Sequence, residues 1–224
     1  MSWDYYEDPR PDIQAVVSAA GRRVLDVGCA GGALAAALKE AGAAYVAGIE
    51  RHPAAAAKAR GRLDVVVEGD ILTTPLPFSV GEFDYIIFGD VLEHLSDPER
   101  AVRRVLPYLS RTGRVVASVP NIRFYVVLLR LLVDRWAYTD HGIRDRTHLR
   151  IFTRRSLEAM LSSCGLLVER IERNYRLMED QSRIGRVGAA ATRLARATVA
   201  PILFRDLMAF QYVVVARRIS SRCA

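Results

Sequence analysis

Short apolar runs alternate with segments of helical periodicity through the first 120 residues of the chain. Runs rich in valine, isoleucine, leucine and phenylalanine predict buried strands; they lie at 23–27, 45–50, 65–68, 83–88 and 114–119. Alanine-rich or amphipathic segments bounded by proline or glycine predict helices; they lie at 9–20, 33–41, 53–61 and 98–110. This ordered alternation predicts an α/β protein with a doubly wound, mostly parallel sheet.

The pattern changes after Pro120. Beyond it we predict helices at 123–133 and 153–164, strands at 166–172 and 210–216, and a polar segment at 137–150. Between the last two strands, apolar residues fall on one helical face at 183–198 and arginines lie elsewhere on that helix. We therefore expect a helical insertion at 175–208, in addition to the helical segment that follows the fifth strand.

Arginine dominates the basic residues. The formal net charge is +7, and only two of the 32 basic residues are lysines, Lys39 and Lys58. This excess fits either the codon bias of a GC-rich genome or an anionic partner such as nucleic acid, a membrane surface or a phosphorylated substrate. Because the arginines are spread over the whole chain, composition alone does not identify such a partner.

Cysteine usage and apolar segments bear on location. Cys29, Cys164 and Cys223 show no spacing typical of disulfide pairs or metal sites, so we expect reduced thiols, no metal ion and a cytoplasmic protein. The acidic N-terminus is unlike a signal peptide. The longest apolar run, Phe124 to Leu129, is far shorter than the about 20 residues of a membrane span.

A glycine-rich turn follows the first predicted strand. Gly28, Gly31 and Gly32 lie between that strand and a helix beginning at Ala33, a layout typical of nucleotide-type cofactor sites. The dinucleotide pattern G-x-G-x-x-G keeps one glycine of three here. Asp26 at the end of the strand suits a cationic cofactor and would repel a pyrophosphate.

Asp26, Gly28 and Gly32 match an acid-x-Gly-x-Gly-x-Gly loop, in which Ala30 replaces the middle glycine. In this loop the chain resembles the class I S-adenosylmethionine-dependent methyltransferases. The resemblance implies S-adenosyl-L-methionine as cofactor and a Rossmann-like sheet of seven strands in the order 3-2-1-4-5-7-6. It also implies one domain over 1–224. This domain has three parts: an N-terminal lid and helix (1–21), a cofactor-binding half (22–120) and a substrate-pocket region (121–165).

The same resemblance assigns cofactor contacts at successive strand ends. Glu50 would hold the ribose hydroxyls, and Arg51 would cover the adenine face. Asp70 would accept from the adenine amino group, and Ile71 would pack on the ring. The remaining contacts are Gly89 and Asp90 beside the methionine part, Tyr6 closing over the methyl group and Arg10 pairing with the cofactor carboxylate.

Two histidine-bearing segments are candidates for catalysis. Residues 90–98 look like the segment after strand four in small-molecule O- and N-methyltransferases, including the ubiquinone-biosynthesis type. Residues 140–153 look like the Asp-x-Thr-His-Leu-Arg-x-Phe-Thr signature of a subgroup found near sugar and natural-product genes. We predict that His148, oriented by Asp145, or failing that His94, is the general base. The alternative is structural: His94 orients its loop, and the second segment is a solvated loop before a helix cap at Thr153.

We therefore expect methyl transfer to an oxygen or nitrogen of a small molecule, such as a sugar, a glycan precursor or a natural product. The alternatives are a nucleic-acid methyltransferase, a membrane-docked or non-catalytic cofactor-binding module that uses the helix at 183–198, and an NAD-dependent oxidoreductase. The chain lacks the Asn/Asp-Pro-Pro-Tyr motif of many base methyltransferases. Nucleic acid is thus a disfavoured partner, peripheral membrane contact stays open, and either a monomer or a homodimer is compatible.

Overall fold

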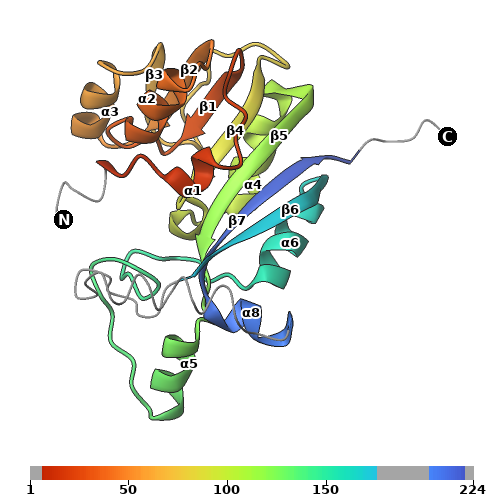
Figure 1. The fold of residues 1–224 in the computed structure, drawn as a ribbon. Helices are drawn as coiled ribbons and strands as arrows, with labels where there is room; N and C mark the ends of the chain where they lie inside the picture. Colours follow the sequence, from red (N-terminus) through yellow and green to blue (C-terminus); the bar gives the residue numbers. More distant parts are fainter. Residues whose placement is uncertain (1–6, 176–201, 220–224) are drawn as a thin grey trace.

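Seven strands form one sheet in the computed structural model, which describes residues 7–175 and 202–219 (Figure 1). The strand order is β3-β2-β1-β4-β5-β7-β6. β7 is antiparallel to both β5 and β6, and the other neighbouring strands are parallel. The predicted α/β fold and its strand order are therefore confirmed.

Helices and strands alternate along the chain as the hydrophobic pattern predicts. The strands are β1 (Arg23–Val27), β2 (Tyr45–Glu50), β3 (Val65–Glu68), β4 (Phe83–Gly89), β5 (Leu109–Pro120), β6 (Leu166–Tyr175) and β7 (Ala209–Arg218). The α-helices are α1 (Pro11–Gln14), α2 (Ala33–Glu40), α3 (Pro53–Ala59), α4 (Pro98–Val105), α5 (Tyr125–Leu132), α6 (Arg154–Ser163) and α8 (Ile202–Met208). Two 3₁₀ helices, η2 (Leu92–His94) and η3 (Leu106–Tyr108), flank α4.

The core lies on both faces of the sheet, because successive strand residues point to opposite sides. Val24 packs in one cluster with Leu38 of α2. Its neighbour Leu25 belongs to the other cluster, with Val102 of α4 and Leu157 of α6. Helices therefore cover both faces, as expected for strands that read as nearly continuous apolar runs (Figure 1).

Two of the predicted helices are longer than the observed ones by about five residues at their C-terminal ends. The first was expected to reach residue 20 but ends at Gln14. The second was expected to reach residue 110, but α4 ends at Val105, and η3, which contains Pro107, leads into β5 at Leu109. Proline lacks the N–H that would continue an α-helix, which explains the second difference.

The carboxyl ends of the parallel strands meet at one edge of the sheet. α5 and the segment before α6 extend beyond this edge (Figure 1). The helix predicted at 183–198 lies outside the described residues, and α8 is the described helical part of the predicted insertion. Among the described helices, none combines the length and apolarity that crossing a bilayer requires.

Candidate active site at the carboxyl edge of the sheet

The turn between β1 and α2 follows a left-handed path at three positions. Gly28 and Gly32 have φ values of +74° and +81°, and Ala30 has a φ of +48°. A Cβ on Gly28 would lie 2.5 Å from Cγ2 of Val91, so glycine is needed there for space as well as for conformation. Ala30 adopts the left-handed conformation that the glycine of the resembled loop would adopt without strain.

Glu50 anchors this turn from the end of β2. Its Oε2 accepts from the backbone N–H of Ala30 at 2.9 Å, and its Oε1 accepts from that of His52 at 2.7 Å. The side chain is buried, with 6% of its surface exposed. Each carboxylate oxygen has a second lone pair, so Glu50 retains the capacity to accept from two neighbouring hydroxyl groups.

Asp26 is a buried carboxyl group next to Glu50. Burial raises its pKa to about 7; the positive charge of Arg10 opposes the shift, and the negative charge of Glu50 adds to it. No described residue donates a hydrogen bond to its side chain. A buried carboxyl group without a donor suits a cationic ligand, so the site fits the positively charged S-adenosylmethionine suggested by the loop.

Arg10 and Asp90 join the N-terminal segment to the end of β4. The guanidinium of Arg10 donates to Asp90 at 2.9 Å, to both carboxylate oxygens of Asp12, and to the hydroxyl of Ser118 at 3.0 Å. Asp90, with a φ of +56°, also accepts from Ser118 and from the side-chain amide of Gln211. Both predicted residues therefore lie at the site, where each already contacts the other.

The remaining predicted cofactor residues surround the same edge. Asp70 is exposed and accepts from the backbone N–H of Leu72, whereas Ile71 is buried. Gly89 ends β4, and a Cβ there would lie 3.2 Å from Ile13. Arg51 is exposed beside His52. Tyr6 lies outside the described residues.

The two candidate catalytic histidines lie together although 54 positions separate them in the chain. Their ring centroids are 4.8 Å apart in an edge-to-face arrangement. Burial, followed by the neighbouring His94, lowers the pKa of His148 below its ordinary value. His148 is consequently neutral near pH 7 and able to accept a proton.

Main-chain contacts decide the tautomer of each ring. Nδ1 of His148 lies 3.2 Å from the carbonyl oxygen of Ile143. Nδ1 of His94 lies 3.3 Å from the carbonyl oxygen of Thr147 and 3.0 Å from its hydroxyl, which itself donates to Asp145 at 2.7 Å. Because a carbonyl only accepts, we assign the hydrogen to Nδ1 and the lone pair to Nε2 in both rings. Asp145 thus orients His94 through Thr147, whereas the carbonyl of Ile143 orients His148.

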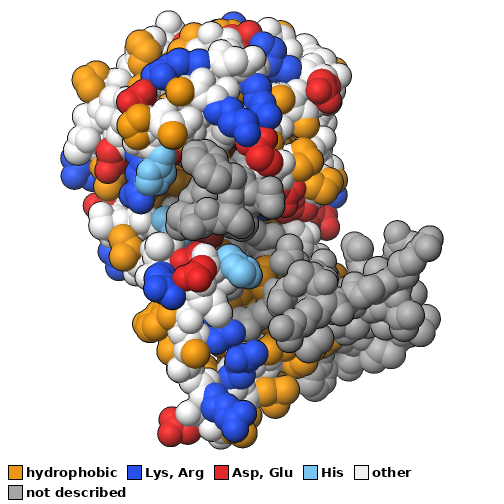
Figure 2. Space-filling model, turned by 90° about the vertical axis from the view of Figure 1, so that its left-hand side faces the viewer, with side chains coloured by type: hydrophobic (Ala, Val, Ile, Leu, Met, Phe, Trp, Pro, Cys, Tyr) orange, Lys and Arg blue, Asp and Glu red, His pale blue; other side chains and the backbone are white. Residues whose placement is uncertain are grey.

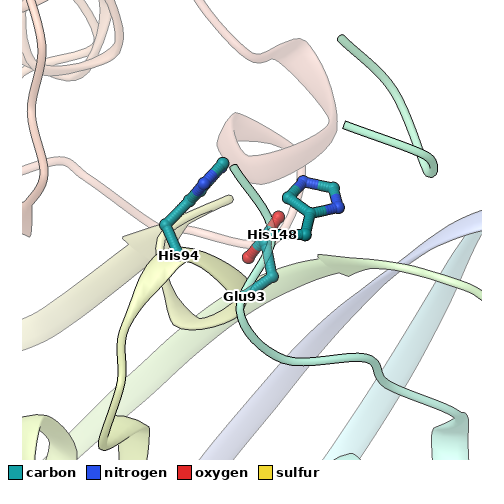
Figure 3. Close-up of side chains that lie close together, drawn as sticks. All are labelled: Glu93, His94 and His148. Carbon is teal, nitrogen blue, oxygen red and sulfur yellow. The ribbon is translucent and has the colours of Figure 1, made fainter. Parts of the chain in front are cut away.

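Glu93 is the site residue that the sequence did not single out. It is 1% exposed, and neither of its carboxyl oxygens has a hydrogen-bond partner among the residues that the structure describes. Burial and the nearby charge of Asp90 raise its pKa well above the ordinary value. The carboxyl group lies close to both imidazole rings (Figure 3), and one potential ligand atom from each of the three residues lies within 4.8 Å of the others. Its position next to His94 in the sequence was the one available signal.

The three side chains are of metal-binding types, and together they form a group that could hold a metal ion. Glu93 and His148 line a small pocket that is partly open to solvent. Its other lining residues are Pro120, Ile122, Ile143, Arg150, Ile151 and Phe152. Five of the eight lining residues are therefore apolar, and Glu93, His148 and Arg150 are the polar ones.

The fold is a doubly wound α/β sheet, and the predicted cofactor residues that the structure describes lie near its carboxyl edge. The methyltransferase domain family model matches residues 5–171. The ubiquinone biosynthesis O-methyltransferase of Azotobacter vinelandii is 30% identical over 184 residues, which cover 75% of this chain and 78% of that relative. The same enzyme of Marinobacter nauticus is 34% identical over 117 residues, 49% of this chain and 48% of the relative, so this match spans about half of its length.

A solved structure shows the same fold. The S-adenosylmethionine-dependent methyltransferase of Mesorhizobium loti superposes with a TM-score of 0.63 at 22% identity, covering 93% of this chain and 96% of that one. The chain belongs to the methyltransferase domain family. It is an S-adenosylmethionine-dependent methyltransferase, and its cofactor is S-adenosyl-L-methionine.

Proposed function

We propose that this methyltransferase acts on an oxygen, or alternatively a nitrogen, of a small molecule bound in the pocket beside His148. The observation that carries the proposal is the Nε2 lone pair of a neutral histidine in a pocket that it lines together with Glu93 and Arg150. An alcohol or phenol must lose a proton when it becomes an ether, and a neutral imidazole is suited to receive it. S-adenosyl-L-methionine supplies a methyl group already activated by its sulfonium sulfur.

We assign cofactor binding to the strand-end residues. Glu50 holds the ribose hydroxyls while it anchors the turn through Ala30. The turn glycines, Gly28 and Gly32, allow close approach, and Asp26 faces the cationic end of the cofactor. The other assigned residues are Asp70, Ile71 and Arg51 around the adenine, Gly89, Asp90 and Arg10 around the methionine part, and Tyr6 over the methyl group.

We assign the acceptor side to His148, with His94 and Asp145 in supporting roles. The protein's main task is to align the acceptor atom with the methyl group and to exclude water. His148 receives the acceptor's proton at Nε2, because its Nδ1 is held by the carbonyl of Ile143. Asp145 fixes Thr147, which in turn fixes the ring of His94.

The relatives favour a small acceptor, because the ubiquinone-type enzymes are named for O-methylation. A sugar, a glycan precursor and a natural product remain the acceptor classes of choice. Among the described residues on the face shown in Figure 2, basic side chains are interspersed with acidic and apolar ones.

The test is a transfer assay with radiolabelled S-adenosylmethionine against small phenols, nucleotide sugars and lipid-linked sugars. We expect labelled product from one of these classes and its loss in His148→Ala. Label transferred to RNA instead, with a steep salt dependence of RNA binding, would identify a nucleic-acid methyltransferase. Calorimetry with S-adenosylhomocysteine checks the cofactor site independently of the acceptor.

A further inference from the structure

Arg150 is a cation of the acceptor pocket to which the proposed transfer assigns no task. It lines this pocket together with Glu93, His148 and five apolar residues. His148, the proposed base, lies two positions before it, so one short segment supplies both side chains. An acceptor that enters the pocket therefore meets a cation as well as the base.

Two sets of hydrogen bonds hold Arg150 in place. Its backbone N–H donates to the carbonyl oxygen of Glu93 at 3.0 Å. Its side-chain Nε donates to the carbonyl oxygen of Ser96 at 3.2 Å, and Nη2 donates to the same oxygen. The guanidinium is thus fixed against the backbone that follows η2. A side chain that is already ordered loses less conformational entropy when it binds a ligand.

Arg150 differs from the arginines on either side of it in the segment. Arg146 forms an ion pair with Asp140 at 2.8 Å, and Arg154 forms one with Asp206 at 3.0 Å. Among the residues that the structure describes, Arg150 has no carboxylate partner, and its Nη1 donates to none of them. Since a guanidinium carries five N–H donors, those of Nη1 are available to a ligand.

The guanidinium also determines the charge of the pocket. Burial and the nearby charge of Asp90 raise the pKa of Glu93 well above its ordinary value, and burial lowers the pKa of His148. Both shifts favour the uncharged form, whereas a guanidinium keeps its charge at every pH at which the protein works. A pocket whose lining carries positive charge attracts anions.

We propose that Arg150 binds an anionic oxygen group, a carboxylate or a phosphate, on the methyl acceptor, so that the substrate of this site is a hydroxylated acid. The inference rests on the proposed function and narrows its acceptor class. A guanidinium recognises the oxygens of either group through paired N–H···O hydrogen bonds. With its acid group held by Arg150, the acceptor presents its hydroxyl to His148 while the apolar residues pack against its carbon skeleton.

The test compares acids with neutral counterparts on the intact protein saturated with S-adenosylhomocysteine, which has no methyl group to donate. One pair of probes is 3-hydroxybenzoate and 3-hydroxybenzamide, and the other is glucose 6-phosphate and glucose. In one pair, calorimetry should give a Kd for the acid that is lower by about tenfold or more, the usual contribution of a hydrogen bond to a charged group. A preference in the first pair identifies a carboxylate, and one in the second pair identifies a phosphate.

Three variants assign this preference to Arg150. Arg150→Gln should raise the Kd of the acid about tenfold and that of the neutral probe by less than about threefold. Arg150→Lys keeps the charge but not the planar fork, and should keep part of the preference. Arg146→Gln is the matched control, because it removes a positive charge from an exposed, paired side chain of the same segment, and it should change neither Kd. An unchanged Kd for S-adenosylhomocysteine shows that each variant is folded.

Transfer kinetics separate binding by Arg150 from a structural role. With an acid acceptor, Arg150→Gln should raise the KM of the acceptor and change kcat much less, because Arg150 contacts neither the proton nor the methyl group that moves. A loss of structure would instead lower transfer to acid and neutral acceptors alike.

Two results would overturn the assignment of Arg150. One is that both pairs show no preference for the acid, whether the probes bind equally or not at all. The other is a preference for the acid that persists in Arg150→Gln. The proposed function survives both results if His148→Ala still abolishes transfer to a neutral phenol. It fails if the wild-type protein methylates none of the small phenols, nucleotide sugars and lipid-linked sugars.

Discussion

Replacing Glu50 by alanine is the sharpest test of the cofactor edge. Two contributions to binding are lost, one direct and one through the turn. Directly, two hydrogen bonds from ribose hydroxyls to a charged group are each worth about 1.5–3 kcal/mol, so the loss is about 3–6 kcal/mol. This range corresponds to a Kd for S-adenosylhomocysteine that is weaker by about 10²–10⁴-fold. Through the turn, Ala30, with a φ of +48°, loses the acceptor of its N–H, which adds to the loss.

The assay is isothermal titration calorimetry, with circular dichroism to show that the variant is folded at the temperature used. The Kd of Glu50→Gln for S-adenosylhomocysteine should lie between those of the wild type and Glu50→Ala. The amide keeps one oxygen but turns an NH₂ group toward a backbone donor. Glu40→Gln controls for the loss of one negative charge. A Kd for Glu50→Ala within threefold of the wild-type value would refute the assignment of Glu50 to the ribose.

Three further predictions concern residues around the same edge and the core. Gly28→Ala should destabilise the fold by about 2–5 kcal/mol through the left-handed φ and the 2.5 Å contact with Val91, and Val91→Ala should restore part of this in urea denaturation. Because the pKa of Asp26 is about 7 in the folded protein, Asp26 keeps a proton there that the unfolded chain loses near pH 4. The contribution of Asp26 to the free energy of unfolding is therefore present at low pH and declines as the pH rises toward 7. Binding of S-adenosylmethionine should release this proton below pH 7. Asp26→Asn should abolish that proton release, measured by calorimetry in buffers of different ionisation enthalpy. Tyr212→Phe should leave stability unchanged or raise it by about 1 kcal/mol in thermal denaturation, because the buried Tyr212 hydroxyl has no partner; a loss above 1 kcal/mol would contradict this.

The sequence predicted the cofactor half closely because its signals are local. β2 and β3 have the bounds that the apolar runs predict, and the predicted N-cap Thr153 is observed. Asp97 accepts from the N–H of Arg100, and Thr153 forms a capping box with Ser156. In a parallel sheet, residues at successive strand ends must meet at one edge, so Asp26 and Glu50 could be placed together without coordinates. The roles assigned to these side chains stay predictions until a ligand is measured.

The acceptor half could not be assembled from sequence in the same way. His94 and His148 were each recognised as candidates, but their contact depends on the docking of residues 149–150 onto Glu93, which no periodicity encodes. The predicted pairing of His148 with Asp145 follows proximity along the chain. In the structure the carboxylate of Asp145 faces Thr147, and the carbonyl of Ile143 takes the Nδ1 side of His148.

The link between these halves lies in the few residues after β4. The carboxylate of Asp90 accepts hydrogen bonds from Arg10 in the N-terminal segment, Ser118 in β5 and Gln211 in β7. Three residues later, the carbonyl oxygen of Glu93 accepts from the backbone N–H groups of residues 149–150, in the segment proposed to bind the acceptor. A displacement of this short stretch therefore moves cofactor contacts and acceptor contacts together. Because in-line transfer depends on the alignment of sulfur, methyl group and acceptor to within a fraction of an ångström, placing both sets of contacts on one stretch ties their relative position to a single rigid unit. Substitutions at Ser118 or Gln211, which lie outside the acceptor pocket, should consequently lower the rate of transfer more than they weaken the binding of either ligand.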